Sequence, residues 1–256
     1  MIVIKTPREQ DLMRKAGHIV ALVFKELKDY IKPGLSTLDI ANMCEKIIRS
    51  NGAYPTFLGM YDFPGSVCIS VNEEVVHGIP SKHRILREGD IVSVDVGATL
   101  NGYIGDACRT YFVGTVTENA RRLVTVTEES FWDAVNKFAH PGARLGDISH
   151  AIQEYCESRG YSIIREYTGH GVGSKLHEDP YIPNYGESGT GPVLKEGMCL
   201  AIEPMVAEGH HAIRVGKDGW VARMKDGKLS SHYENSILIT KDGYEVLTML
   251  KEDHHG

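Results

Sequence analysis

The sequence predicts an α+β fold made of two similar halves, about residues 1–115 and 116–256, within one domain spanning 1–256. Three observations support this prediction. Each half starts with two amphipathic helices, continues into apolar strand segments, and joins those segments by short turns that contain glycine. Hairpin turns favour antiparallel strands, because parallel strands need a longer crossover between them. We therefore expect curved antiparallel sheets from both halves to meet, with the helices flanking them.

The first half opens with two helices that have recognisable ends. A Thr-Pro pair at residues 6–7 and the acid Glu9 form a capped helix start. Apolar residues then recur at three- and four-residue spacing as far as the Lys-Pro-Gly turn at 32–34. Ser36 caps a second helix, and the Asn-Gly pair at 51–52 stops it. Both helices should bury one apolar face.

The second half repeats this plan at a constant offset. The segment that begins at Leu86, LREGDIVSVD, recurs at Leu194 as LKEGMCLAIE, which is an offset of 108 residues. The turn His140-Pro141-Gly142 keeps the same offset from the turn at 32–34. Two copies are too few for a repeat solenoid, so a pseudo-twofold arrangement of the halves is the economical interpretation.

Turn signals separate the later strand candidates and predict hairpins. They are Asn101-Gly102, Lys217-Asp218-Gly219, Lys225-Asp226-Gly227 and Lys241-Asp242-Gly243. Asn-Gly and Asp-Gly pairs tolerate the positive φ angles that tight hairpin turns need. We expect each turn to connect two antiparallel strands.

Four acids occupy related places in the two halves. Asp95 interrupts the apolar strand Ile91–Val96, and Glu203 falls at the same point of the later copy. Each half has a second acid on a later strand candidate, Asp106 and Glu234. A single strand-edge acid is more often a cap or an ion-pair partner. Four converging carboxylates would repel one another strongly, whereas two divalent cations would balance their charge, so the pattern predicts a dinuclear metal site.

The chemistry of that site follows from its ligands. Carboxylate oxygens with at most one or two imidazoles favour manganese, iron(II) or cobalt, and zinc is compatible with them. His77 and His170 lie beside glycines and His177 follows in Leu176-His177-Glu178-Asp179-Pro180, but their spacing leaves open which is a ligand and which is an ordinary hydrogen-bonded histidine. Two cations about 3.5–4 Å apart can activate water and polarise a carbonyl, which is the logic of metal-assisted hydrolysis.

Composition limits the classes of partner. The net charge of −6 and the pI of about 6.1 argue against nucleic acid as a specific partner. Five cysteines without a Cys-x-x-Cys pair fit a reducing cytoplasm rather than a disulfide framework or structural zinc. No signal peptide and no apolar run of about 20 residues is present, so we expect a cytoplasmic protein without membrane contact. We assign no role to the His pair at 254–255.

Several segments together resemble type I methionine aminopeptidases, from the Lys-Thr-Pro start at residues 5–7 to about Leu247. They are Val71-Asn72-Glu73, His77-Gly78-Ile79-Pro80, Asp95, Asp106, Thr168-Gly169-His170-Gly171-Val172-Gly173, Ile202-Glu203-Pro204-Met205 and Tyr233-Glu234. The resemblance implies the pita-bread fold and removal of the initiator methionine from nascent proteins, with a preference for a small second residue. It also implies a monomer that uses two divalent cations, with transient ribosome contact as a further expectation.

The resemblance assigns roles to individual residues. The five implied metal ligands are Asp95, Asp106, His170, Glu203 and Glu234. Among them Asp106 and Glu234 are expected to bridge both cations, and Glu203 is also the expected proton shuttle. His77 and His177 are implied to contact the substrate peptide and the tetrahedral intermediate. All three residues, His77, His177 and Glu203, are therefore the expected catalytic groups.

A methionine-binding pocket is implied as well. Its residues, which contact the substrate, are Phe57, Met60, Phe63, Cys68, His77, His177 and Trp220. The chain departs from many bacterial relatives at Phe57, Met60 and Leu176, where those relatives have a smaller residue, a Tyr and a Phe. Without the resemblance, plain core packing would explain Phe57, Met60 and Phe63 equally well.

Two alternatives share this fold. An X-Pro aminopeptidase or dipeptidase has the same metal ligands, but such enzymes usually carry a further N-terminal domain, and here the first capped helix begins at residue 7. A non-catalytic pita-bread protein that binds RNA or a partner protein tends to lose ligands, and all five are present here. The short stretch between Glu203 and Glu234 leaves no room for the helical insertion of type II enzymes.

Overall fold

The computed structural model describes residues 1–250 and 252. The His pair at 254–255 lies outside the described residues. The helices are α1 (Pro7–Tyr30), α2 (Thr37–Ser50), α3 (Glu118–Phe138) and α4 (Leu145–Glu157), with a short 3-10 helix at Met60–Asp62. Both capped starts of the first half are confirmed, since Thr6 and Ser36 each form a capping box with an acid three residues later. No described helix has the length and apolarity needed to cross a bilayer.

Fifteen short or medium strands make up the β-structure of the described residues. In the first half they are β1 (Tyr54–Pro55), β2 (Cys68–Val71), β3 (Glu74–Val76), β4 (Ile91–Leu100) and β5 (Tyr103–Phe112). In the second half they are β6 (Ser162–Ile163), β7 (Gly169–Gly171), β8 (Glu178–Ile182), β9 (Cys199–Ile202), β10 (Met205–Ala207), β11 (Ile213–Val215), β12 (Ala222–Met224), β13 (Ser230–His232), β14 (Glu234–Ile239) and β15 (Tyr244–Val246).

The main sheet has nine strands and joins the two halves. Its order is β1-β4-β5-β14-β9-β7-β8, with β2 added to β4 and β15 to β14. The pairing of β5 with β14 is the junction between the halves, and it is antiparallel like the other pairings of this sheet. Two three-stranded sheets, β13-β10-β6 and β11-β12-β3, complete the fold. The α+β architecture with antiparallel sheets is therefore confirmed.

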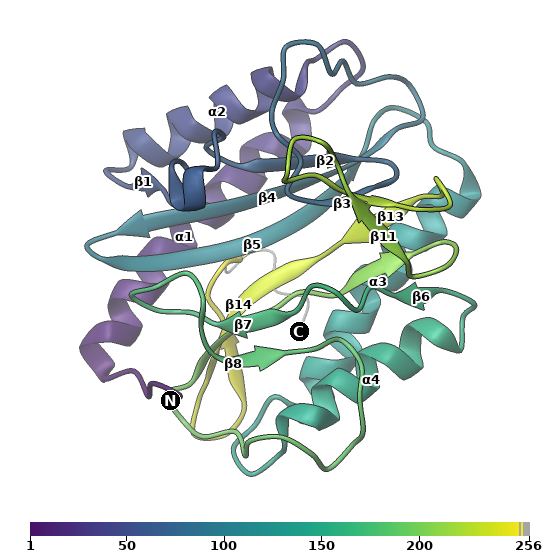
Figure 1. Cartoon of the computed structure of the whole chain (residues 1–256). Coiled ribbons are helices and arrows are strands. Elements are labelled where there is room, and N and C mark those ends of the chain that lie inside the picture. The colour runs from purple at the N-terminus through teal and green to yellow at the C-terminus, as the bar shows by residue number, and fades with distance from the viewer. Residues whose placement is uncertain (251, 253–256) are drawn as a thin grey trace.

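Helix pairs flank the sheet on the side of each half (Figure 1). One apolar core lies between α1, α2 and the first-half strands, and it contains Val92, Val94 and Val96. A second core packs α3 and α4 against the second-half strands, and it contains Ile202 and Ile237. Because side chains alternate along a strand, the three valines fill the helix side of β4 and leave Asp95 on the opposite side.

Three of the four predicted hairpin turns are confirmed. Asn101 and Gly102 have φ angles of 52° and 82° and close the long β4–β5 hairpin. The turns at 217–219 and 241–243 close the β11–β12 and β14–β15 hairpins. The prediction for 225–227 is wrong, because β12 pairs with β3 and β11 whereas β13 pairs with β10. That turn carries the chain from one small sheet to the other.

Candidate metal centre and substrate cavity

The antiparallel register gathers the predicted acids on one face of the main sheet. Cys108, in the middle of β5, is paired with Asp95 of β4 on one side and with Glu234 of β14 on the other. Paired residues project from the same face of a sheet, so two carboxylates flank the Cys108 side chain. Asp106 lies two residues along β5 and shares that face.

Glu203 reaches the same place from a strand end. Ile202, the last residue of β9, is paired with Asn235, so the chain leaves β9 at Glu203 beside Glu234. Pro204 then separates β9 from β10. The predicted equivalence of the two copies therefore holds for position but not for conformation, since the earlier acid lies inside the unbroken strand β4.

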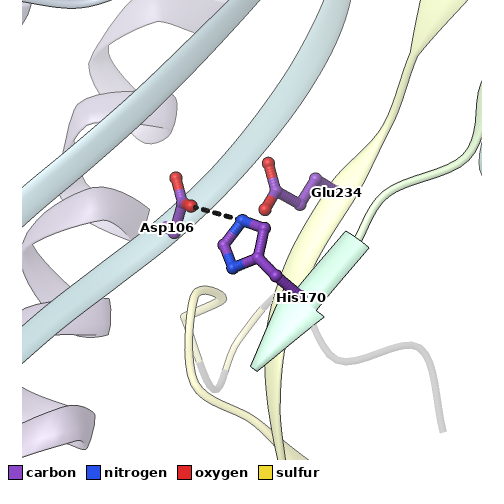
Figure 2. A group of neighbouring side chains, drawn as sticks. All are labelled: Asp106, His170 and Glu234. Atoms are coloured by element: carbon purple, nitrogen blue, oxygen red, sulfur yellow. Dashed lines mark ion pairs between the residues drawn. The ribbon is translucent and has the colours of Figure 1, made fainter. Parts of the chain in front are cut away.

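Figure 2 shows three side chains that face one another from three strands: Asp106, His170 and Glu234. Their donor atoms lie within 4.8 Å of one another, and all three residues are buried. The Nε2 atom of His170 is 3.6 Å from Oδ2 of Asp106. Nδ1 of the same ring lies 2.9 Å from the carbonyl oxygen of Gly171. That carbonyl fixes the proton on Nδ1 and leaves the Nε2 lone pair directed at the carboxylates.

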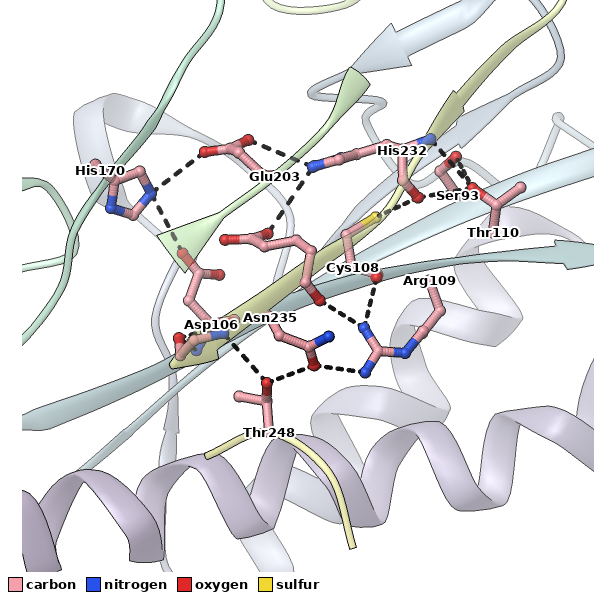
Figure 3. A network of polar contacts seen from close by, with 12 residues as sticks. Ser93, Asp106, Cys108, Arg109, Thr110, His170, Glu203, His232, Asn235 and Thr248 are labelled. Atoms are coloured by element: carbon pink, nitrogen blue, oxygen red, sulfur yellow. Dashed lines mark hydrogen bonds and ion pairs between the residues drawn. The ribbon is translucent and has the colours of Figure 1, made fainter. Parts of the chain in front are cut away.

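A second group shares Glu234 with the first and contains a histidine that the sequence analysis missed. Glu203, His232 and Glu234 also place one donor atom each within 4.8 Å. The Nε2 atom of His232 is 3.3 Å from Glu203 and 3.9 Å from Glu234, and Nε2 of His170 is 3.6 Å from Glu203. Glu203 thus lies between two imidazoles (Figure 3). The available signal was the two-residue spacing of His232 and Glu234, which puts two side chains on one face of an extended chain, although a break at Tyr233 places them on separate strands, β13 and β14.

Burial and mutual repulsion penalise the ionised carboxylates. Burial, followed by the charge of Asp106, raises the pKa of Asp95 well above its usual range. Burial alone raises the pKa of Asp106 to about 7. Burial and the neighbouring acids likewise raise the pKa values of Glu203 and Glu234. Divalent cations that bind such a cluster displace the protons that its carboxyl groups hold.

The residues present fit divalent cations. Four buried atoms of this centre have no hydrogen-bond partner among the described residues, namely Oδ1 of Asp95, Oδ1 of Asp106, Oε1 of Glu234 and Nε2 of His232. Buried polar atoms normally have partners, so these atoms are available as ligands. Asp95 lies outside both three-residue groups but lines the same cavity. The five predicted ligands are therefore brought together, with His232 in addition.

The histidines of the site are neutral at neutral pH. Burial lowers the pKa of His170 to about 4 and that of His232 to about 3. Burial, with the nearby His177, lowers the pKa of His77 to about 4, and burial also lowers that of His177. Neutral imidazoles can ligate a cation or donate a hydrogen bond to a carbonyl.

A cavity of about 400 Å³ ends at the carboxylates. Every residue predicted for the substrate pocket lines it, as do the predicted ligands; the pocket residues are Phe57, Met60, Phe63, Cys68, His77, His177 and Trp220. Leu176 lines it too. Most of these side chains are apolar, so the cavity has an apolar end and an acidic end. Their individual roles in binding and catalysis stay predictions.

His77 and His177 stand on different walls of this cavity. The ring of His77 packs edge-on against the rings of Tyr167 and Trp220, with 5.2 Å and 6.3 Å between the ring centroids. His77 itself has a positive φ of 62°, an uncommon conformation for a non-glycine residue that is often found at functional sites. The ring of His177 packs edge-on against the ligand candidate His170 at 4.6 Å. Both histidines can therefore reach a molecule held between the apolar and acidic ends.

Comparison with known proteins identifies the family of this chain. Residues 11–241 match metallopeptidase family M24. The chain is 52% identical to methionine aminopeptidase 1 of Bacillus subtilis, over 97% of this chain and 99% of that protein. It is 51% identical to the methionine aminopeptidase of Clostridium acetobutylicum, again over 97% and 99%. This chain belongs to the methionine aminopeptidases of family M24.

Solved structures agree with this assignment. The methionine aminopeptidase of Thermotoga maritima superimposes with a TM-score of 0.96 at 50% identity, covering 98% of this chain and 100% of that one. The prolidase from Pyrococcus furiosus has a TM-score of 0.77 at 27% identity, and the match covers only 66% of its chain. The predicted family and pita-bread fold are confirmed, and the X-Pro alternative is not favoured. As a member of M24 the chain is a metallopeptidase.

Beneath the carboxylates of this M24 site lies a partly buried arginine, Arg109. The guanidinium of Arg109 donates hydrogen bonds to the backbone carbonyls of Cys108 and Glu234, at 2.9 and 2.5 Å, and to Oδ1 of Asn235 at 2.6 Å. It also stacks on the ring of Tyr233. Figure 3 shows how these contacts tie β5 to β14 on the side of the sheet opposite the carboxylates. Arg109 thereby fixes the backbone from which Glu234 projects.

Cys108 is a neutral spacer in this M24 centre. Burial, followed by the charge of Asp95, raises the pKa of its thiol well above the usual range, so the sulfur stays protonated. Its Sγ donates to the carbonyl oxygen of His232 at 3.7 Å. A protonated thiol is a poor metal ligand, because cations bind the thiolate. The cysteine therefore separates two acids without adding a fifth negative charge.

Proposed function

We propose that this chain removes the N-terminal methionine of polypeptides, with a preference for a small second residue, and that its four carboxylates hold two divalent cations. The observation that carries the proposal is the single cavity with an apolar end and an end formed by Asp95, Asp106, Glu203 and Glu234. The apolar end suits a thioether side chain. The acidic end suits divalent cations and also the free amine at the start of a peptide.

The proposed ligands are the five predicted from the sequence, with Asp106 and Glu234 shared between the two cations. Glu234 belongs to both three-residue donor groups, which supports its bridging role. The oxygen-rich set favours manganese, iron(II) or cobalt, and zinc remains compatible. When bound, two such cations would polarise the scissile carbonyl and lower the pKa of a nearby water.

Glu203 is the proposed general base and acid. It projects from a strand end and its side chain is 12% exposed, so it can meet water and substrate at the cavity wall. Its carboxylate would accept a proton from the attacking water and then deliver that proton to the departing amine. Burial, followed by the charges of Asp95 and Asp106, raises the pKa of Glu203, which makes its carboxylate a better proton acceptor.

His77 and His177 are proposed to bind the peptide carbonyl. Their lowered pKa values make them neutral donors, and they line the cavity between its two ends. A neutral imidazole directed at a carbonyl stabilises the negative charge that develops on the oxygen during attack. The aromatic wall of Phe57, Phe63 and Trp220 would hold the methionine side chain, with Met60 and Cys68 filling the remaining surface.

The cellular setting belongs to the proposal too. We propose a cytoplasmic monomer that acts on the N-terminal peptides of nascent proteins, with transient ribosome contact. The acidic net charge of −6 supports a peptide rather than a nucleic acid as the specific partner.

A comparison of two tripeptides tests the proposal. The protein is supplied with Mn²⁺ and offered Met-Ala-Ser and Ala-Pro-Ser in parallel, and free amino acids are measured. Release of methionine from Met-Ala-Ser with no cleavage of Ala-Pro-Ser is the expected result. Cleavage of Ala-Pro-Ser alone would instead support an X-Pro peptidase, and no cleavage of either peptide would support a binding protein.

A further inference from the structure

Two tyrosines stand exposed at the mouth of the cavity. The residue exposure is 73% for Tyr61 and 74% for Tyr181, although both line the same cavity as the carboxylates. Large aromatic side chains are usually covered in a folded protein, and those that stay exposed beside a cleft often contact a ligand. Neither tyrosine belongs to the proposed methionine pocket or to the metal centre.

The backbone holds Tyr61 in an unusual conformation. Tyr61 has φ 50° and ψ 31°, and Asp62 follows with φ 68°, so two successive non-glycine residues are left-handed. Side chains disfavour this conformation, and residues held in it concentrate at functional sites. The Tyr61 ring lies nearly parallel to the ring of His177, with 15° between the planes and 6.4 Å between the centroids.

Tyr181 approaches the same region from the edge of the main sheet. It lies on β8, the last strand of the sheet order, and is paired in register with His170 on β7. His170 in turn contacts the ring of His177 at 4.6 Å. The two tyrosines are therefore joined through two histidines of the site, one by ring stacking and one by strand pairing.

The chemistry of the mouth suits a peptide of variable sequence. No Lys or Arg is among the described residues that line the cavity, so an acidic side chain of the substrate has no basic partner there, and Glu166 is the one acid of this lining outside the metal centre. Tyrosine offers a large, rigid aromatic face with few rotatable bonds, and such a face packs on a peptide backbone whatever its side chains are. Each residue of an extended peptide advances about 3.3 Å. When the first two residues occupy the cavity, the third and fourth residues therefore lie at this mouth.

We propose that Tyr61 and Tyr181 form a subsite that binds the backbone of the third and fourth residues of the substrate peptide, irrespective of sequence. This inference rests on the proposed aminopeptidase function. The subsite adds binding energy only for substrates that are long enough to reach it, and so it favours polypeptides over free dipeptides.

The test compares substrate lengths in the Mn²⁺-loaded enzyme. The kcat/KM is measured for Met-Ala-amide and for Met-Ala-Ser-Gly-Ser, and the ratio of the longer to the shorter substrate is the readout. The Tyr61→Ala/Tyr181→Ala double variant should lower that ratio about tenfold, mainly through a higher KM for the pentapeptide, as expected for the loss of two aromatic contacts. A ratio separates subsite loss from any shift of His177, because such a shift would affect both substrates alike.

Matched variants complete the design. Tyr61→Phe/Tyr181→Phe should keep the wild-type ratio, because the ring faces remain. Tyr54→Ala, at a tyrosine that is 47% exposed and outside the cavity lining, should also keep it. An unchanged ratio in the double alanine variant, with an unchanged melting temperature, would overturn the subsite. Failure of the wild type to release methionine from either substrate would overturn the proposed function itself.

Discussion

The Nε2 atom of His232 lies 3.3 Å from Oε2 of Glu203, behind the cavity lining, where His232 is only 2% exposed. This contact links β13 to the end of β9, and the strand that follows β9 along the chain, β10, is paired with β13. Since Glu203 is the proposed base, the contact places a neutral imidazole beside the group that must accept and return a proton.

Glu203→Ala should abolish methionine release without unfolding the chain. The variant loses both a ligand and the proton-accepting group, and general-base loss alone is worth about 10²–10⁴ in rate. Peptide turnover and circular dichroism are measured on the same Mn²⁺-loaded sample. Undiminished cleavage of Met-Ala-Ser by a folded variant would contradict the assignment of Glu203.

His232→Ala should lower kcat/KM about 10- to 100-fold, which is the usual cost of removing a group that orients a metal-binding or catalytic residue. His18→Ala is the matched control, because His18 is exposed on α1 and should leave kcat/KM unchanged. Steady-state kinetics on both variants give the comparison. Equal activity of the two variants would show that the His232–Glu203 contact has no part in the reaction.

His77→Ala should lower turnover by about 10² or more while metal binding survives, because the imidazole is proposed to stabilise charge on the substrate carbonyl. Turnover is measured by methionine release, and Mn²⁺ affinity by calorimetric titration. Weakened Mn²⁺ binding in this variant would instead make His77 a metal ligand.

A buried ion pair anchors the turn that carries His177. The Nζ atom of Lys5 lies 2.6 Å from Oε2 of Glu178, and the two side chains are only 3% and 9% exposed. Lys5→Met should destabilise the protein by about 3–5 kcal/mol, because it leaves the Glu178 charge buried without a partner. Adding Glu178→Gln should recover part of that loss, since the unpaired charge is then removed.

Urea unfolding measures both effects. The surface pair of Arg14 and Glu245, with both side chains 38% exposed, supplies the control. Arg14→Met should cost no more than about 1 kcal/mol, as is usual for exposed ion pairs. A loss in Lys5→Met no greater than in Arg14→Met would contradict the importance of the buried pair.

The sequence predicted much of this site because its signals were local or repeated. The 108-residue offset related Asp95 to Glu203, and alternation along β4 put Asp95 opposite the buried valines. His232 was missed because its partner Glu203 lies on another strand, and no spacing along the chain reports that contact. The Lys5–Glu178 pair joins residues 173 positions apart, and the mouth formed by Tyr61 and Tyr181 likewise exists only after folding.

The metal-free protein should lose stability as the pH rises through the carboxyl pKa values. Asp106 has a pKa of about 7 in the folded protein and about 3.9 when unfolded, so between these values the folded state holds more protons. The unfolding free energy contributed by this group is therefore highest below about pH 4 and falls as the pH rises towards 7. His170 acts in the opposite direction. Because its pKa is lowered to about 4 in the folded protein, its contribution to the unfolding free energy rises between about pH 4 and 6.5.

Comparing melting temperatures with and without metal isolates the contribution of the carboxylates to the pH dependence of stability. A bound divalent cation offsets their repulsion, and it displaces the protons that they hold, so its binding tightens as the pH rises. The melting temperature with excess Mn²⁺, minus that with EDTA, should be larger at about pH 7.5 than at about pH 5.5. Asp106→Asn, which removes a titrating ligand, should make this difference smaller and flatter. A wild-type difference that is constant over this range would mean that the carboxyl groups are already ionised at the lower pH, against their raised pKa values.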